Sequence, residues 1–156
     1  MDESGLEREI ERLHQACFAW ALGCCRWDRQ EAEDVLQTTY LKVMDGRARY
    51  DGRASVKTWL FAIIRKTAAD ARRRWFLRRR GWAAPTPAVD DAERSADRAR
   101  ARAALASLSR RQREVLDLVF FHDLTIEEAA RVMAVSLGSA RVHYERGKAR
   151  LRDLLT

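Results

Sequence analysis

The chain has 156 residues, of which 47% are hydrophobic, and this fraction excludes an intrinsically disordered chain. Its length fits one domain of ordinary size or two small ones. Only 7 glycines and 2 prolines occur beside abundant Ala, Leu, Arg and Glu, which predicts an all-α protein. The formal net charge of +7 favours a polyanionic partner.

The N-terminal segment is acidic and is followed by a short apolar run. Acidic residues such as Asp2, Glu3 and Glu7 are not typical of a secretory signal peptide. The longest apolar run, residues 16–25, is too short to span a bilayer. We therefore expect a cytoplasmic protein without membrane insertion.

The first expected helix covers residues 4–26, because apolar side chains recur there at spacings of three and four. This stripe consists of Leu6, Ile10, Leu13, Cys17, Trp20 and Cys24. Cys17 and Cys24 are small enough to pack in a core. With His14 and Cys25 they also leave a metal or redox switch as an alternative, although no C-x-x-C pair occurs. The pattern favours core packing, and we expect no metal and no cofactor.

Two further helices are expected in the N-terminal half, at residues 31–46 and 56–80. They are separated by a polar loop, residues 45–55, which contains Gly46 and Gly52. The inward-facing residues of the second of these helices are Val56, Leu60, Ile63, Ile64 and Ala68. Arginines become frequent toward its end.

Residues 81–91 contain both prolines and interrupt the helical periodicity, which predicts a flexible linker. A new helix is expected to begin near residues 91–97, and another to cover residues 110–122. We therefore expect two small helical domains, residues 1–80 and 97–156, joined by a linker at residues 81–96.

The last third of the chain has the pattern of a helix-turn-helix. Thr125 and Glu128 have the spacing of a capping box at the start of the first helix. After a turn at residues 134–138, the inward line of the second helix is Ala140, Tyr144, Gly147 and Leu151. The opposite face carries Arg141, His143, Arg146, Lys148 and Arg150. A helix that is apolar inside and cationic outside fits the DNA major groove, although a solvated basic face is an alternative.

The positive charge is concentrated in two blocks. Residues 47–80 contain twelve Arg or Lys and two Asp, and residues 131–152 contain six Arg or Lys and one Glu. Two separate basic blocks favour two nucleic-acid contact surfaces.

With both halves in view, the chain resembles bacterial σ70-class sigma factors, and more narrowly their extracytoplasmic-function (ECF) group, which keeps only regions 2 and 4. The segment AEDVLQTTYLKV at residues 32–43 is similar to the family pattern AEDxxQxxFxxxx. Residues 50–65, YDGRASVKTWLFAIIR, are similar to FxGxxxFxxWLxxIAxN. Residues 105–116, LASLSRRQREVL, followed by the helix-turn-helix, resemble region 4.

The resemblance implies a role for each block. Residues 1–80 would be region 2, which binds core RNA polymerase and recognises and melts the −10 element, and residues 97–156 would be region 4, which recognises the −35 element. Asp34 and Gln37 would bind the clamp helices of the β′ subunit, and the β subunit would also contact the chain. The resemblance further implies promoter DNA and an anti-sigma factor as partners, and a protein that is not itself an enzyme.

The same resemblance implies two sets of DNA-binding residues. The −10 set, which includes a pocket for a flipped base at residues 51–55, is Asp51, Arg53, Ser55, Lys57, Trp59, Arg65, Lys66, Arg73 and Arg74. Arg72 would add to the attraction for phosphate. Trp59 is either a stacking platform for a base or a core residue. The −35 set is Ser139, Arg141, Val142, His143, Glu145, Arg146 and Lys148.

Several positions depart from the family pattern. Lys66 replaces a frequent Asn, and Ala134 replaces the usual turn glycine. Ser139 and Ala140 replace a common Thr-Val pair, and Val142, His143 and Glu145 are unusual. We therefore transfer no −35 consensus sequence.

Two alternatives of other classes remain besides the metal or redox switch. A helix-turn-helix regulator would use residues 1–80 for sensing or dimerisation and would bind DNA without polymerase. Attachment to a membrane surface would use residues 72–80 together with Trp75, Phe76 and Trp82.

Overall fold

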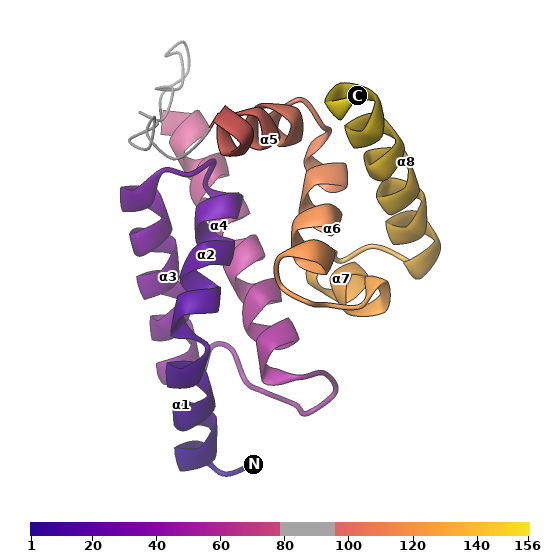
Figure 1. The fold of residues 1–156 in the computed structure, drawn as a ribbon. Helices are drawn as coiled ribbons and strands as arrows, with labels where there is room; N and C mark the ends of the chain where they lie inside the picture. Colours follow the sequence, from indigo (N-terminus) through magenta and orange to yellow (C-terminus); the bar gives the residue numbers. More distant parts are fainter. Residues whose placement is uncertain (79–95) are drawn as a thin grey trace. The chain divides into compact units, whose positions relative to one another are not determined.

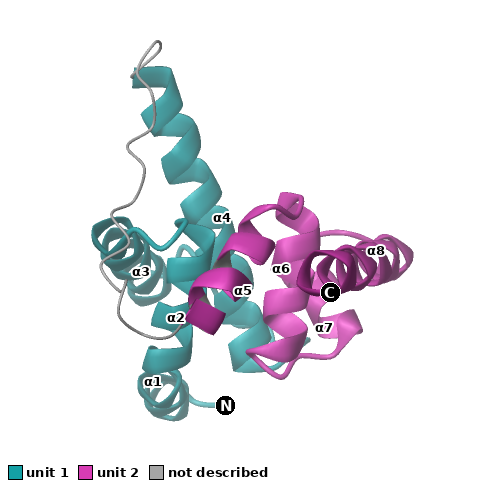
Figure 2. Cartoon of the chain, turned by 45° about the horizontal axis from the view of Figure 1, so that its top comes forward, with its two compact units in different colours: residues 1–87 teal, residues 88–156 magenta. Residues whose placement is uncertain are grey.

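The structure, a computed structural model, describes residues 1–78 and 96–156. These residues form eight helices and no strand. The chain divides into two compact units, residues 1–87 and 88–156, which are coloured separately in Figure 2. The prediction of an all-α, two-domain fold is confirmed.

The first unit is built on three long helices that pack against one another (Figure 1). They are α2 (His14–Cys24), α3 (Arg29–Met44) and α4 (Val56–Arg78), preceded by α1 (Glu3–Arg12). At their centre the Trp20 and Phe61 rings stack with centroids 5.6 Å apart. The indole Nε1 of Trp20 also donates a hydrogen bond to the Phe61 carbonyl at 3.0 Å. Both side chains are buried, so this pair fixes α2 against α4.

The single helix expected over residues 4–26 is instead two helices, so this prediction was wrong: the helix is interrupted at Leu13. Leu13 has φ −89° and ψ 0°, which ends α1 and begins α2. The backbone hydrogen bonds continue through the bend, because Leu13 N donates to Glu9 O and Cys17 N to Leu13 O. Leu13 is only 5% exposed, so the bend lies where its side chain enters the core.

The second unit contains four helices, of which the last three pack against one another. They are α5 (Ala96–Ala106), α6 (Arg110–Phe120), α7 (Ile126–Met133) and α8 (Leu137–Leu155). The predicted capping box at Thr125 is confirmed, because Thr125 Oγ1 accepts from Glu128 N and Glu128 Oε1 from Thr125 N, each at 3.0 Å. Ser136 caps α8 by accepting from Ser139 N at 3.1 Å.

The turn between α7 and α8 contains a strained alanine. Ala134 has φ 56° and ψ 43°, the left-handed conformation that costs a residue with a Cβ about 1–2 kcal/mol. Its N–H still donates to Arg131 O, and Val135 N donates to Ala130 O. Alanine therefore preserves the turn that glycine usually makes, at a cost in stability.

We expect Ala134→Gly to raise the free energy of unfolding of the second unit by about 1 kcal/mol, because glycine adopts positive φ without strain. Ala149→Gly is the matched control. Ala149 is exposed inside α8, where glycine should instead lower stability by about 0.5–1 kcal/mol. Urea denaturation of both variants measures the two changes, and a loss of stability in Ala134→Gly would contradict the strain at this turn.

The predicted linker lies outside the described residues, except that Ala96 begins α5. Arg79, Arg80 and Trp82 also lie outside them. Within residues 1–78 and 96–156, no helix is both long and apolar enough to cross a membrane.

Candidate nucleic-acid and partner interfaces

Asp34 and Gln37 lie on the exposed side of α3. The opposite side of this helix is buried through Ala32, Val35 and Leu36, so packing in the core fixes which face is presented. Gln30 donates a hydrogen bond to Asp34 Oδ1 at 3.3 Å, one turn earlier on the same face. The helix therefore presents the Asp34 carboxylate and the Gln37 amide on one exposed face, a pair that suits arginine side chains of a partner.

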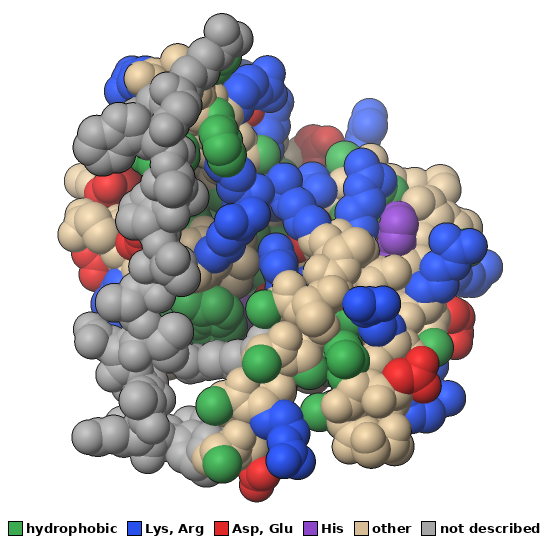
Figure 3. All heavy atoms as spheres, turned by 90° about the horizontal axis from the view of Figure 1, so that it is seen from above, with side chains coloured by type: hydrophobic (Ala, Val, Ile, Leu, Met, Phe, Trp, Pro, Cys, Tyr) green, Lys and Arg blue, Asp and Glu red, His purple; other side chains and the backbone are tan. Residues whose placement is uncertain are grey.

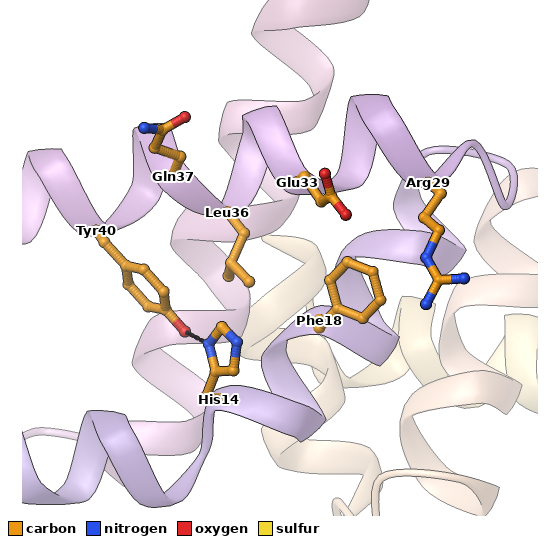
Figure 4. Close-up of a pocket in the computed structure, with 7 residues that line it drawn as sticks. All are labelled: His14, Phe18, Arg29, Glu33, Leu36, Gln37 and Tyr40. Carbon is orange, nitrogen blue, oxygen red and sulfur yellow. Dashed lines mark hydrogen bonds between the residues drawn. The ribbon is translucent and has the colours of Figure 1, made fainter.

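A shallow groove with a volume of about 420 Å³ lies beside Gln37, between α2 and α3 (Figure 4). It is lined by His14, Phe18, Arg29, Glu33, Leu36, Gln37 and Tyr40. His14 Nδ1 and Tyr40 Oη are 2.9 Å apart, at hydrogen-bond distance. No pattern in the sequence indicates this groove, because its walls come from two helices whose relative rotation is set by the core.

The three cysteines are buried in and just after α2. Cys17 is fully buried and Cys25 is 2% exposed. Burial raises the pKa of Cys17 to about 11 and that of Cys25 to about 12, so both thiols are protonated at neutral pH. In the part of the chain that the structure describes, no three His, Cys, Asp or Glu side chains are grouped to hold a metal ion.

The loop before α4 is organised by its own polar side chains. Asp51 Oδ1 accepts from Arg53 N at 3.0 Å across Gly52, which has φ 77°. Ser55 caps α4 by accepting from Thr58 N at 3.1 Å. Asp51, Arg53 and Ser55 are all exposed. The loop is thus a defined turn that presents these side chains to solvent.

Trp59 packs against Tyr50, with ring centroids 5.2 Å apart and an interplanar angle of 57°. Its side chain is half-buried. The Tyr50 hydroxyl in turn donates to the Ala54 carbonyl, so the two rings brace the loop against the first turn of α4. The structure therefore gives Trp59 a packing partner in the loop, whereas a contact with a DNA base stays a prediction.

Basic side chains follow α4 from end to end. Lys66, Arg73 and Arg74 are exposed, and Lys57 and Arg65 are half-buried. Arg72 has a different position, because its guanidinium donates to the Cys24 carbonyl at 2.6 Å. It therefore ties α4 to the end of α2, a structural contact between residues 48 apart that the cationic run in the sequence does not indicate.

Tight packing positions α8 in the second unit. Ala129, Ala130 and Ala140 are buried where α7 and α8 cross. A Cβ added at Gly147 would be 2.9 Å from Leu116 Cδ1 and 3.3 Å from Gln112 Cβ, both on α6. Gly147 thus allows a close approach of α6 and α8 that another residue would obstruct.

The remaining surface of α8 carries the predicted −35 residues. Arg141, Val142, Glu145 and Arg146 are exposed, whereas Ser139, His143 and Lys148 are half-buried. Figure 3 shows blue Lys and Arg side chains gathered in several places on the surface, with red carboxylates between them. An exposed helix surface with cations around Val142 fits recognition of base edges and phosphates.

Acidic side chains of α6 are held inside the second unit. Glu114 is 7% exposed and accepts from Arg110 Nε at 2.8 Å. Burial raises the pKa of Asp117 to about 7. The positive charge of Arg113 lowers this pKa and the negative charge of Glu114 raises it further, but both effects are smaller than that of burial. The Glu114 carboxylate is thus enclosed in the second unit, whereas the Asp117 side chain is 23% exposed.

Comparisons with known proteins agree with this two-part arrangement. The family model for Sigma-70 region 2 matches residues 10–82, and that for Sigma-70, region 4 matches residues 98–151. RNA polymerase sigma factor CarQ of Myxococcus xanthus is 33% identical over 129 residues, which cover 80% of this chain and 74% of CarQ. ECF RNA polymerase sigma factor SigX of Bacillus subtilis is 30% identical over 139 residues, which cover 80% of this chain and 71% of SigX.

A solved structure is similar over nearly the whole chain. It is the co-crystal structure of the sigma factor RpoE with the anti-sigma factor NepR from Bartonella quintana. RpoE matches with a TM-score of 0.81 and 25% identity, covering 96% of this chain and 95% of that chain.

Proposed function

Since the chain belongs to the σ70 family, as an alternative sigma factor of the ECF group, we propose that its two units divide promoter recognition between them. The first unit, with a boundary near residue 80, binds core RNA polymerase and opens the −10 element. The second, from about residue 97, holds the −35 element. The observation that carries this division is the pairing of an exposed Asp34–Gln37 face with a separate helix-turn-helix.

In this proposal, Asp34 and Gln37 bind the β′ clamp helices. The loop at residues 51–55 and the basic side chains of α4 bind the melted −10 strand. Cationic side chains offset part of the cost of unstacking a flipped base, which is a few kcal/mol. The exposed side chains in the first half of α8, around Arg141 and Val142, enter the major groove of the −35 element.

An anti-sigma factor is a further proposed partner, since the similar RpoE was solved with NepR. Such a partner would control the protein by covering the faces that bind polymerase and DNA. The work of the chain is binding and positioning, and we assign it no catalytic step. We expect it to act in the bacterial cytoplasm, where its polymerase and DNA are found.

The experiment that tests the proposal is co-purification of the tagged chain with bacterial core RNA polymerase, followed by run-off transcription from a promoter library. We expect stoichiometric binding and initiation from a defined subset of promoters. Tight binding to duplex DNA by the chain alone, without binding to core polymerase, would instead indicate a helix-turn-helix regulator and overturn the roles given to residues 30–75.

We expect Arg141→Ala to reduce discrimination between promoters by roughly 1–3 kcal/mol. The reason is that an exposed arginine on α8 can donate two hydrogen bonds to the edge of one guanine. Equilibrium binding of the reconstituted holoenzyme to promoters that differ in the −35 element measures this change. Arg150→Ala is the control, since Arg150 is also exposed on α8 but lies farther along the helix. An equal loss on every promoter would assign Arg141 to a phosphate.

A further inference from the structure

Phe120, the last residue of α6, has an aromatic ring that is not part of the buried core. It is 56% exposed, so most of its surface remains in water. Its ring stacks on Tyr144 of α8, with centroids 6.1 Å apart and an interplanar angle of 22°. The contact therefore links the end of α6 to the middle of the proposed recognition helix.

Tyr144 in turn holds a lysine. The Lys148 ammonium lies over the Tyr144 ring, 4.4 Å from its centroid, one helical turn later. The same ammonium is 3.5 Å from Glu145 Oε1. The Lys148 side chain is 31% exposed, whereas that of Glu145 is 68% exposed. Ring and carboxylate together thus restrict a side chain that is ordinarily among the most flexible.

The location of Lys148 on α8 suits a phosphate better than a base. With 3.6 residues per turn, Lys148 lies about 120° around the helix from the exposed Val142. A residue on the flank of a recognition helix meets the DNA backbone, and an ammonium acts there as a point charge.

We propose that Phe120 is a positioning residue for promoter binding: by stacking on Tyr144 it holds the Lys148 ammonium where it meets a phosphate of the −35 duplex. Because Lys148 is ordered before binding, less conformational entropy is lost when the contact forms. This inference rests on the proposed role of α8, and it assigns an effect on DNA binding to a residue of α6, which acts through Tyr144 and Lys148.

A double-mutant cycle on the reconstituted holoenzyme tests the proposal with a −35 promoter duplex. Lys148→Ala should weaken binding and reduce the slope of log affinity against log salt by about 1. Phe120→Ala should weaken binding roughly two- to fivefold, the range expected when a cation–π contact is loosened. In the Lys148→Ala background, Phe120→Ala should cause no further loss, because its effect acts through that ammonium.

Two variants separate positioning from a general effect of removing an aromatic side chain. Phe120→Tyr keeps the ring and should bind the promoter duplex with wild-type affinity. Phe121→Ala removes the neighbouring, 69% exposed ring and should leave affinity unchanged. Equal losses from Phe120→Ala with and without Lys148, or no loss at all, would overturn the proposal.

A measurement without DNA keeps the proposal testable by itself. Protons near the Lys148 ammonium lie over the Tyr144 ring, so NMR should find them shifted upfield in the whole chain. Phe120→Ala should move these signals toward their random-coil positions, and Phe121→Ala should not; unchanged signals in Phe120→Ala would count against positioning.

Normal affinity of Lys148→Ala beside a promoter-dependent loss in Arg141→Ala would overturn this inference alone. Normal affinity of both variants would overturn the −35 role of α8 as well.

Discussion

Asp34→Arg is expected to abolish binding to core RNA polymerase while the first unit stays folded. Asp34 is exposed, and its hydrogen bond to Gln30 is a contact within one helix, so an arginine fits there without disturbing the core. In the proposed interface the carboxylate faces arginines of the β′ clamp helices. Placing like charges there costs several kcal/mol, which corresponds to a loss of affinity of at least about 100-fold.

Fluorescence anisotropy of the labelled chain with core polymerase measures this loss, and circular dichroism checks the fold. Glu7→Arg is the matched control, because it makes the same change of charge at an exposed position on α1. We expect it to bind core polymerase within about twofold of wild type, a difference of less than about 0.5 kcal/mol. Normal binding by Asp34→Arg would remove α3 from the polymerase interface.

Gly147→Leu is expected to destabilise the second unit by about 3 kcal/mol or more, because there is no room for its side chain. The Leu116 methyl that would meet the new Cβ belongs to a residue only 1% exposed, so it cannot move aside into solvent. A small domain has a net stability of only about 5 kcal/mol. About 2 kcal/mol of stability would then remain, so the second unit should stay mostly folded but open on the order of 100-fold more often than the wild type, although every exposed side chain of α8 is retained.

Hydrogen exchange of amides in α6 and α8, followed by mass spectrometry, measures the loss of stability where it occurs. Gly138→Ala is the control, since a Cβ at Gly138 would have no atom within 4 Å. Alanine in the first turn of α8 should slow exchange slightly, because it is the better helix former. Wild-type protection in Gly147→Leu would mean that α6 and α8 are not in close contact at this point.

Most of the helical architecture followed from local signals. The three-and-four spacing of apolar residues predicted the segment of α1 and α2, although as one helix, and that of α4, and the capping box of Thr125 with Glu128 located the start of α7. Such signals involve residues within one or two turns of each other. The bend at Leu13 has no such signal, since neither proline nor glycine occurs there, and it was missed.

Contacts between distant segments limited what could be predicted about the interfaces. The sequence placed Asp34 and Gln37 on one helix face, but the groove beside them depends on how α2 and α3 are rotated against each other. Arg72 belongs to a cationic run, yet its hydrogen bond joins it to Cys24, 48 residues earlier. The stacking of Phe120 on Tyr144 likewise joins residues of different helices, which no periodicity reveals.

Because the three cysteines are buried, the rate at which their thiols are labelled measures how often the first unit opens. A thiol-specific reagent reaches Cys17 or Cys25 only when α2 separates from the helices packed on it, since both sulfurs are enclosed and protonated. The labelling rate of the folded chain therefore counts these openings directly. Any partner that binds only the closed form must slow the reaction in proportion to its occupancy, whichever face it covers.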